Sequence, residues 1–172
     1  MRDIKFKAQR VGDREWVYGS YTQMREEDHN ECFRTKPHKT YHRIWQWEAG
    51  DWNMGGYANY EVIPETVCQW TELLDKHGSK IFEGDIFQYR KHDGYLLPDF
   101  TGEVLFMMGC FGYVATSENM GEAFRSFSEI DELQEDFLNH IEIICNIHDK
   151  ERQKQALINM IRLDEELGLY DE

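Results

Sequence analysis

The chain has 172 residues, of which 41% are hydrophobic and 14% aromatic, so it has the length and apolar content of a single folded domain rather than of a disordered segment. Its 19 basic and 33 acidic residues give a net charge of −14. This acidity disfavours wrapping of nucleic acid, which requires Lys and Arg against phosphates. The charge is uneven, with a balance of +3 over residues 1–47 and −17 over residues 48–172.

Targeting and membrane segments are not expected. Charges interrupt the apolar residues at the N-terminus, which disfavours a secretion signal. The longest uncharged run, residues 104–117, is too short and too rich in glycine to cross a bilayer as a helix. The sequence therefore predicts a soluble, cytoplasmic protein without membrane contact.

Side chains alternate with period two near the N-terminus, which is typical of half-buried strands. The alternation places two sets of side chains on single faces: Ile4, Phe6 and Ala8 in a first strand, and Trp16 and Tyr18 in a second. Residues 11–14 form a turn between them. Residues 22–40 are polar, lack periodicity and contain Pro37, which predicts a long loop or arm.

The segment 40–48 alternates again and gives a face of aromatic and cationic side chains. This face comprises Tyr41, Arg43, Trp45 and Trp47. Such a set favours packing or a subunit interface, where aromatic rings bury a large area. The alternative is a stacking surface for single-stranded nucleic acid, supported by the nearby Arg34 and Lys39.

The middle of the chain combines short strands with two glycine turns. Residues 61–63, 67–73 and 86–90 are expected as strands, and Gly78 and Gly84 as structural turns. Residues 103–108 and 112–116 are apolar enough for a pair of buried strands. Two tight turns between short strands predict an antiparallel unit.

The C-terminal third contains one more strand and a helix. An acidic stretch at 118–142 includes Ser128 as a helix cap. The following strand, 141–147, places Ile141, Ile143, Cys145 and Ile147 on one face. Helical spacing then predicts a tail helix over 150–172. The predicted fold is mainly β, with antiparallel sheets in a domain over residues 1–149 and one C-terminal α-helix.

Several segments spread along the chain form one recognisable pattern: Arg2–Ala8, Trp16–Gly19, Glu65–Thr71, Leu73, Asp75–Lys76, Gly78, Lys80–Ile86, Gly102–Val104 and Ile141–Ile147. Together they resemble the YopX family of phage and prophage proteins. The chain departs from the family pattern at Glu72, where the family has glycine, at Leu74 in place of lysine, and at His77 in place of asparagine.

The resemblance implies a largely β fold with small barrel-like substructures, a tendency to form homo-oligomers, and a mobile-element origin in a bacterial host. It implies no established activity, so no catalytic residues follow from it.

Two groups of side chains are candidates for a metal site. His29, Cys32, His38 and His42 are suitable zinc ligands. However, four residues of an extended strand span about 13 Å, too far for His38 and His42 to share one ion, which favours a polar surface arm instead. Glu83 and Asp85 are candidates to share a divalent ion, but Gly84 between them favours a turn with an acid that caps backbone N–H groups. We therefore expect no metal and no cofactor.

The leading functional hypothesis is a non-enzymatic phage or prophage accessory protein that forms homo-oligomers and contacts a host or phage protein. The alternatives are a single-stranded nucleic-acid binder that uses the Tyr41–Trp47 face, and a metal-dependent hydrolase.

Overall fold

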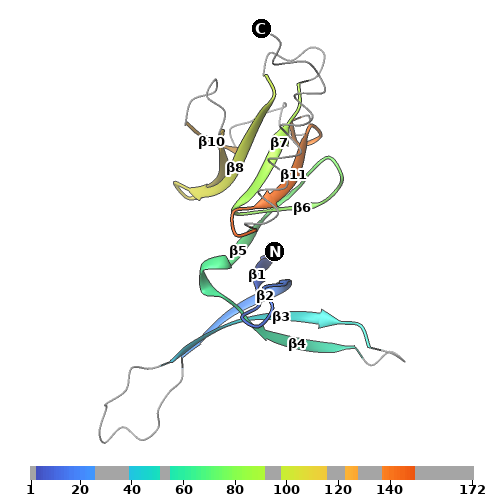
Figure 1. The fold of residues 1–172 in the computed structure, drawn as a ribbon, viewed down its shortest axis with the longest axis vertical. Helices are drawn as coiled ribbons and strands as arrows, with labels where there is room; N and C mark the ends of the chain where they lie inside the picture. The colour runs from blue at the N-terminus through green and yellow to red at the C-terminus, as the bar shows by residue number, and fades with distance from the viewer. Residues whose placement is uncertain are drawn as a thin grey trace, which may run out of the picture. The chain divides into compact units, whose positions relative to one another are not determined.

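The computed structural model describes residues 3–25, 39–50, 55–91, 98–115, 123–127 and 137–149. The chain divides into two compact units, Met1–Trp70 and Thr71–Glu172. Strands dominate both units (Figure 1), so the prediction of a mainly β fold with antiparallel sheets is confirmed. Within the described residues, no helix is long and apolar enough to cross a membrane.

The first unit is built on a twisted antiparallel sheet (Figure 1). Its elements are β1 (Phe6–Gln9), β2 (Trp16–Arg25), β3 (Thr40–Glu48), β4 (Gly56–Glu61) and the 3-10 turn η2 (Pro64–Thr66). Strand β5 (Cys68–Leu74) begins in this unit and ends in the second. The strand order is β4-β3-β2-β1-β5-β6, where β6 is Lys80–Phe82.

Strand β2 pairs with two neighbouring strands, and its pairing partner changes at Gly19. Residues 16–19 pair with β1, and residues 20–25 pair with β3. A Cβ at Gly19 would lie only 2.0 Å from the carbonyl oxygen of Trp45, so glycine permits the close approach of the two strands. Because β2 continues to Arg25, residues 22–25 and Thr40 of the expected arm are strand residues instead; residues 26–38 lie outside the described residues.

The core of the first unit is small. Its buried side chains are Ala8, Val17, Ile44 and Val62, with Phe6, Tyr21, Tyr60 and Val67 packed around them. Ile44 is fully buried, whereas Tyr18 in β2 is exposed. The side of β2 that contributes to the core is therefore that of Val17, and the side of β3 is that of Ile44.

The second unit contains a five-stranded antiparallel sheet of order β10-β9-β8-β7-β11. Its strands are β7 (Asp85–Tyr89), β8 (Phe100–Met107), β9 (Cys110–Ala115), β10 (Phe124–Ser126) and β11 (Ile141–Asn146). Strands β8 and β9 form a hairpin in which Met108 and Gly109 have φ of 53° and 84°, as a type I′ turn requires.

Two features of this sheet differ from the sequence expectation. Strand β10 lies in the acidic stretch where no strand was predicted, because it completes the edge beside β9. The register of β11 shifts between Ile143 and Cys145, so the predicted one-sided alternation from Ile141 to Ile147 does not hold.

Aromatic rings dominate the core of the second unit. Phe87, Tyr89, Phe100, Tyr113 and Phe137 are all buried, and their ring centroids lie 5.1–6.4 Å apart in stacked and edge-to-face pairs. A Cβ at Gly102 would lie 2.6 Å from the ring of Phe87. The glycine thus lets the ring lie across the neighbouring strand.

One part of the expected fold is not found as predicted, and another lies outside the described residues. In the part of the chain that the structure describes, each sheet has an open strand order, so the barrel-like substructures implied by the resemblance are not closed barrels. The predicted C-terminal helix at 150–172 lies outside the described residues.

Candidate binding face on strands β2, β3 and β4

The sheet of the first unit presents an aromatic face on the side opposite Ile44. The register pairs Trp47 with Tyr57, Trp45 with Asn59 and Ser20 with Trp45, and paired residues point to the same side of a sheet. We define the aromatic face as Met24, Tyr41, Arg43, Trp45, Trp47, Tyr57 and Asn59. It includes all four residues that the sequence singled out on β3 and adds neighbours from β2 and β4.

Trp47 and Tyr57 are the most exposed rings of the aromatic face. Their exposed fractions are 59% and 68%, yet the two rings contact each other edge to face with centroids 5.1 Å apart. They belong to a pair without direct backbone hydrogen bonds, where side chains approach most closely. Gly55 makes room for this arrangement, since a Cβ there would lie 2.6 Å from the Trp47 ring.

The other end of the aromatic face carries two cations over one ring. Lys39 Nζ lies 4.5 Å from the centroid of the Tyr41 ring, and Arg43 Cζ lies 5.7 Å from it. Arg43 also donates to the Asn59 side chain at 2.6 Å. Trp45 Nε1 donates to Thr22 Oγ1 at 3.0 Å and thereby fixes its indole ring. Several side chains of the face are therefore held by contacts with one another.

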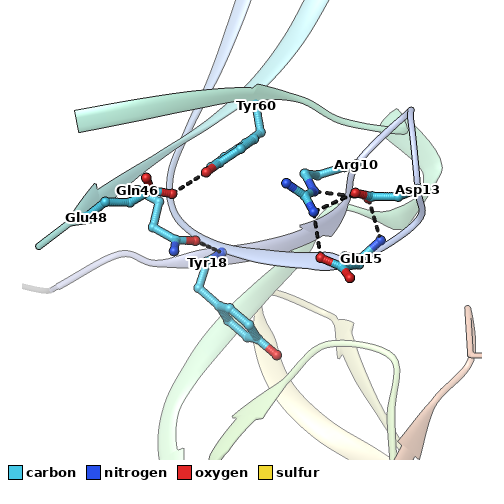
Figure 2. Close-up of polar contacts among 7 residues, drawn as sticks. All are labelled: Arg10, Asp13, Glu15, Tyr18, Gln46, Glu48 and Tyr60. Atoms are coloured by element: carbon cyan, nitrogen blue, oxygen red, sulfur yellow. Dashed lines mark hydrogen bonds and ion pairs between the residues drawn. The ribbon is translucent and has the colours of Figure 1, made fainter. Parts of the chain in front are cut away.

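The opposite side of the same strands is occupied by contacts within the unit (Figure 2). The hydroxyl of Tyr60 donates to the Glu48 carboxylate, which raises the pKa of Tyr60. The side chain of Gln46 accepts from the backbone N–H of Tyr18 at 3.1 Å, beside the point where β2 changes partner. The guanidinium of Arg10 lies 5.1 Å from the centroid of the Tyr60 ring.

Arg10 also closes the turn between β1 and β2 (Figure 2). It contacts Asp13 and Glu15, each at 2.5 Å from Nη2. The backbone N–H of Glu15 donates to Asp13 at 3.0 Å, and this hydrogen bond together with Arg10 lowers the pKa of Asp13. These exposed contacts hold the turn between β1 and β2 together.

Of the four candidate zinc ligands, the structure describes only His42. His42 lies on the side of Ile44, and its Nδ1 is 2.5 Å from the hydroxyl of Tyr21. His29, Cys32 and His38 lie outside the described residues. Across the ranges that the structure describes, no group of three or more His, Cys, Asp or Glu side chains is placed to hold a metal ion.

Asp85, which was paired with Glu83 as a candidate for binding a divalent ion, instead takes part in hydrogen bonds within the fold. It is 1% exposed, and its Oδ2 accepts from the backbone N–H of Phe82 at 2.7 Å. Its Oδ1 accepts from the side chain of Asn146 at 2.9 Å, and the same amide donates to the Glu83 carbonyl at 3.2 Å. Asp85 therefore closes the turn at Gly84, whose φ is 73°, onto the end of β11.

A similar network surrounds the other turn glycine. Asp75 Oδ1 accepts from the backbone N–H groups of His77 and Ser79 at 2.9 and 2.8 Å, and Gly78 has a φ of 77°. Asp75 Oδ2 accepts from Ile143 in β11 at 3.3 Å. At the Gly84 turn the sequence favoured an acid that caps backbone N–H groups, but Asp75 at the Gly78 turn was not singled out. For Asp75, the Asp-x-x-Gly spacing of an Asx turn was the available signal.

A comparison with models of protein families identifies the family of this chain. The model of the YopX protein family matches residues 5–153. The chain belongs to the YopX family. Glu72, where the resemblance led us to expect glycine, has a φ of 72°, so the position requires the left-handed conformation that glycine adopts at little cost.

The other comparisons add a structural neighbour of this YopX chain. The crystal structure of protein EF1440 from Enterococcus faecalis is similar at 20% sequence identity and a TM-score of 0.45; the match covers 88% of this chain and 97% of that one. No curated protein matches the chain.

Proposed function

We propose that this YopX chain is a non-enzymatic binding protein that associates with a second copy of itself through the aromatic face. The observation that supports this most is the pair Trp47 and Tyr57, whose rings contact each other at 59% and 68% exposure on the side away from the core. Exposed aromatic rings are costly in water and are enriched at the centres of protein interfaces.

The local charge also supports self-association. The unit Met1–Trp70 contains ten basic and eleven acidic residues, a balance of −1, so two copies of it repel each other little. The whole chain, however, carries −14. Added salt screens that repulsion, and self-association should therefore strengthen as ionic strength rises.

The experiment is light scattering combined with sedimentation over a range of concentrations. The wild-type protein should be larger than a monomer, and the double variant Trp47→Ser, Tyr57→Ser should raise the dissociation constant at least tenfold. The control is Met108→Ser, which changes a side chain that is 89% exposed in the second unit and should leave the mass unchanged. A wild-type protein that remains monomeric at every concentration contradicts the proposal.

A second candidate function is binding of single-stranded nucleic acid by the same face. It is supported by Lys39 and Arg43, which place positive charge over the ring of Tyr41. This function predicts quenching of tryptophan fluorescence by an oligonucleotide, weaker binding with added salt, and weaker binding for Trp45→Ala. Self-association has the opposite salt dependence, which separates the two functions.

A further inference from the structure

The outer edge of β4 has backbone groups directed away from its sheet. In the part of the chain that the structure describes, β4 is the last strand on its side. Val62 donates to the carbonyl of His42 at 2.9 Å, which identifies these residues as a hydrogen-bonded pair of the β3–β4 ladder. Such pairs alternate along an antiparallel ladder, so Tyr57, Asn59 and Glu61 direct their N–H and C=O groups away from β3.

One end of this edge is already engaged. The backbone N–H of Val11 donates to the carbonyl of Glu61 at 3.1 Å. The section available for another strand is therefore centred on Tyr57 and Asn59.

The usual protection of an edge strand is lacking in β4. The strand Gly56–Glu61 has no lysine, no proline and no register shift, and its one charge is at Glu61, although 30% of the chain is charged. Natural edge strands normally carry such features because an unprotected edge recruits other strands. An uncharged edge also offers nothing specific to a highly charged partner.

We propose that β4 pairs antiparallel with β4 of a second copy of this chain, about a two-fold axis at Ala58. This inference rests on the proposed self-association and specifies its geometry. In this register Tyr57 lies opposite Asn59 of the second copy, and the reverse pair follows from the symmetry. The outward backbone groups of both residues then become hydrogen-bonded pairs. Ala58 faces its own counterpart, where the two Cα atoms approach to about 4.5 Å and a small side chain is needed.

The same register covers the exposed rings. Tyr57 belongs to the aromatic face, and its diagonal neighbour across the new ladder is Tyr57 of the second copy, within reach of an aromatic side chain. Within each copy, the ring of Trp47 contacts the ring of Tyr57. The two ring pairs therefore form one continuous cluster over the two-fold axis, which explains why the edge and the aromatic face belong to one interface.

The first test uses proline at the edge. Asn59→Pro removes an outward N–H but no hydrogen bond to β3, and an extended Ala58 is compatible with a following proline. We expect this variant to be monomeric in light scattering where the wild type is associated. Asn59→Thr loses the same contact to Arg43 but keeps the N–H, and it should associate as the wild type does. Equal association of the proline variant and the wild type overturns the inference.

The second test reports the register directly and does not depend on the proline variant folding. Cysteines at a pair of facing residues without hydrogen bonds, about 4.5 Å apart, meet the geometry of a disulfide. Under mild oxidation of dilute protein, Ala58→Cys should form a covalent dimer well beyond the wild-type level. Asn59→Cys should form such a dimer much more slowly, because residue 59 of each copy lies opposite Tyr57 of the other copy, and the two cysteines do not face each other. Absence of the Ala58→Cys dimer overturns the inference.

The two proposals can fail separately. If the double variant Trp47→Ser, Tyr57→Ser loses self-association while Asn59→Pro keeps it, the face mediates association and the edge does not. If wild-type protein never associates, both proposals are wrong. If Asn59→Pro alone loses association, the edge pairing stands and the aromatic face is not needed.

Discussion

The two units of this chain use their aromatic residues in opposite ways. In the unit Thr71–Glu172, rings are stacked inside the sheet and form most of the buried core. In the unit Met1–Trp70, the buried core residues are four small or aliphatic ones and the rings packed around them are only partly buried, while Trp47 and Tyr57 remain exposed. Charge differs as well, with −13 in the second unit and −1 in the first.

This contrast separates stability from recognition. Burying an aromatic side chain stabilises a fold by several kcal/mol, so the second unit gains stability from its rings. A ring kept at the surface contributes little to folding and leaves its apolar area for a partner. We infer that the first unit provides the contact surface. The second unit provides the larger buried core and nearly all of the net negative charge.

The largest expected effect tests this contrast with one truncation in each unit. Phe87→Ala removes a fully buried ring at the centre of the aromatic core and should lower the free energy of unfolding by about 3–5 kcal/mol. Trp47→Ala should change it by no more than about 0.5 kcal/mol, because the ring is largely exposed. Urea unfolding followed by circular dichroism measures both. A similar decrease in the free energy of unfolding in the two variants would contradict the proposed difference between the two units.

The next effect concerns the polar network that closes the turn at Gly84. Asp85→Ala leaves the buried N–H of Phe82 and the amide of Asn146 without the acceptor they use now, so the second unit should lose roughly 2–3 kcal/mol. Asp85→Asn keeps one acceptor oxygen and should lose less. The measurement is thermal unfolding with and without a chelator.

The chelator arm separates the structural role of Asp85 from a metal role. If Asp85 and Glu83 held a divalent ion, a chelator would destabilise the wild-type protein and leave Asp85→Ala unchanged. The hydrogen-bond network instead predicts the same response to the chelator in both proteins.

Part of this architecture is predictable from the sequence alone. Period-two alternation located β1 and β3, and the strand expected at 67–73 covers most of β5. Positive φ was expected at Gly78 from the turn composition around it. The residues of the aromatic face on β3 were also grouped correctly, since strand alternation alone places them on one side.

Other features depend on contacts that alternation does not encode. Strand β10 is short and polar, and it forms only because β9 offers an edge to it. The shift in β11 inserts a residue into the pattern, and alternation cannot locate such a shift in an all-apolar run. Strand β4 was missed because Gly55 and Gly56 at its start resemble a loop, so neither Tyr57 nor the outer edge of β4 could be assigned to the site.

A smaller effect concerns the backbone at Glu72. A side chain in the left-handed region costs about 1–2 kcal/mol relative to glycine, and part of this is offset by the extra freedom of glycine in the unfolded chain. Glu72→Gly should therefore raise the free energy of unfolding by about 0.5–1 kcal/mol. Glu72→Ala removes the same carboxylate but keeps a Cβ. Equal stability of the two variants would show that the carboxylate, and not the backbone, determines the effect.

The smallest effect is the pH dependence of the ion pair between β11 and the turn after β5. The hydrogen bond from Lys76 Nζ to the Glu142 carboxylate, at 2.5 Å, lowers the pKa of Glu142 below its usual 4.5, with help from His77. A lowered pKa stabilises the fold above pH 4.5, and this contribution disappears as the pH falls through the folded-state pKa.

Glu142 is 47% exposed, so solvent screening limits the contribution of this pair to a few tenths of a kcal/mol. Lys76→Met should therefore be slightly less stable than the wild type at pH 6, and the difference should vanish near pH 3. Urea unfolding at both pH values measures it. Lys91→Met removes another lysine of the same unit and should leave the difference between the two pH values as in the wild type; a similar change in both variants would assign the effect to net charge rather than to the pair.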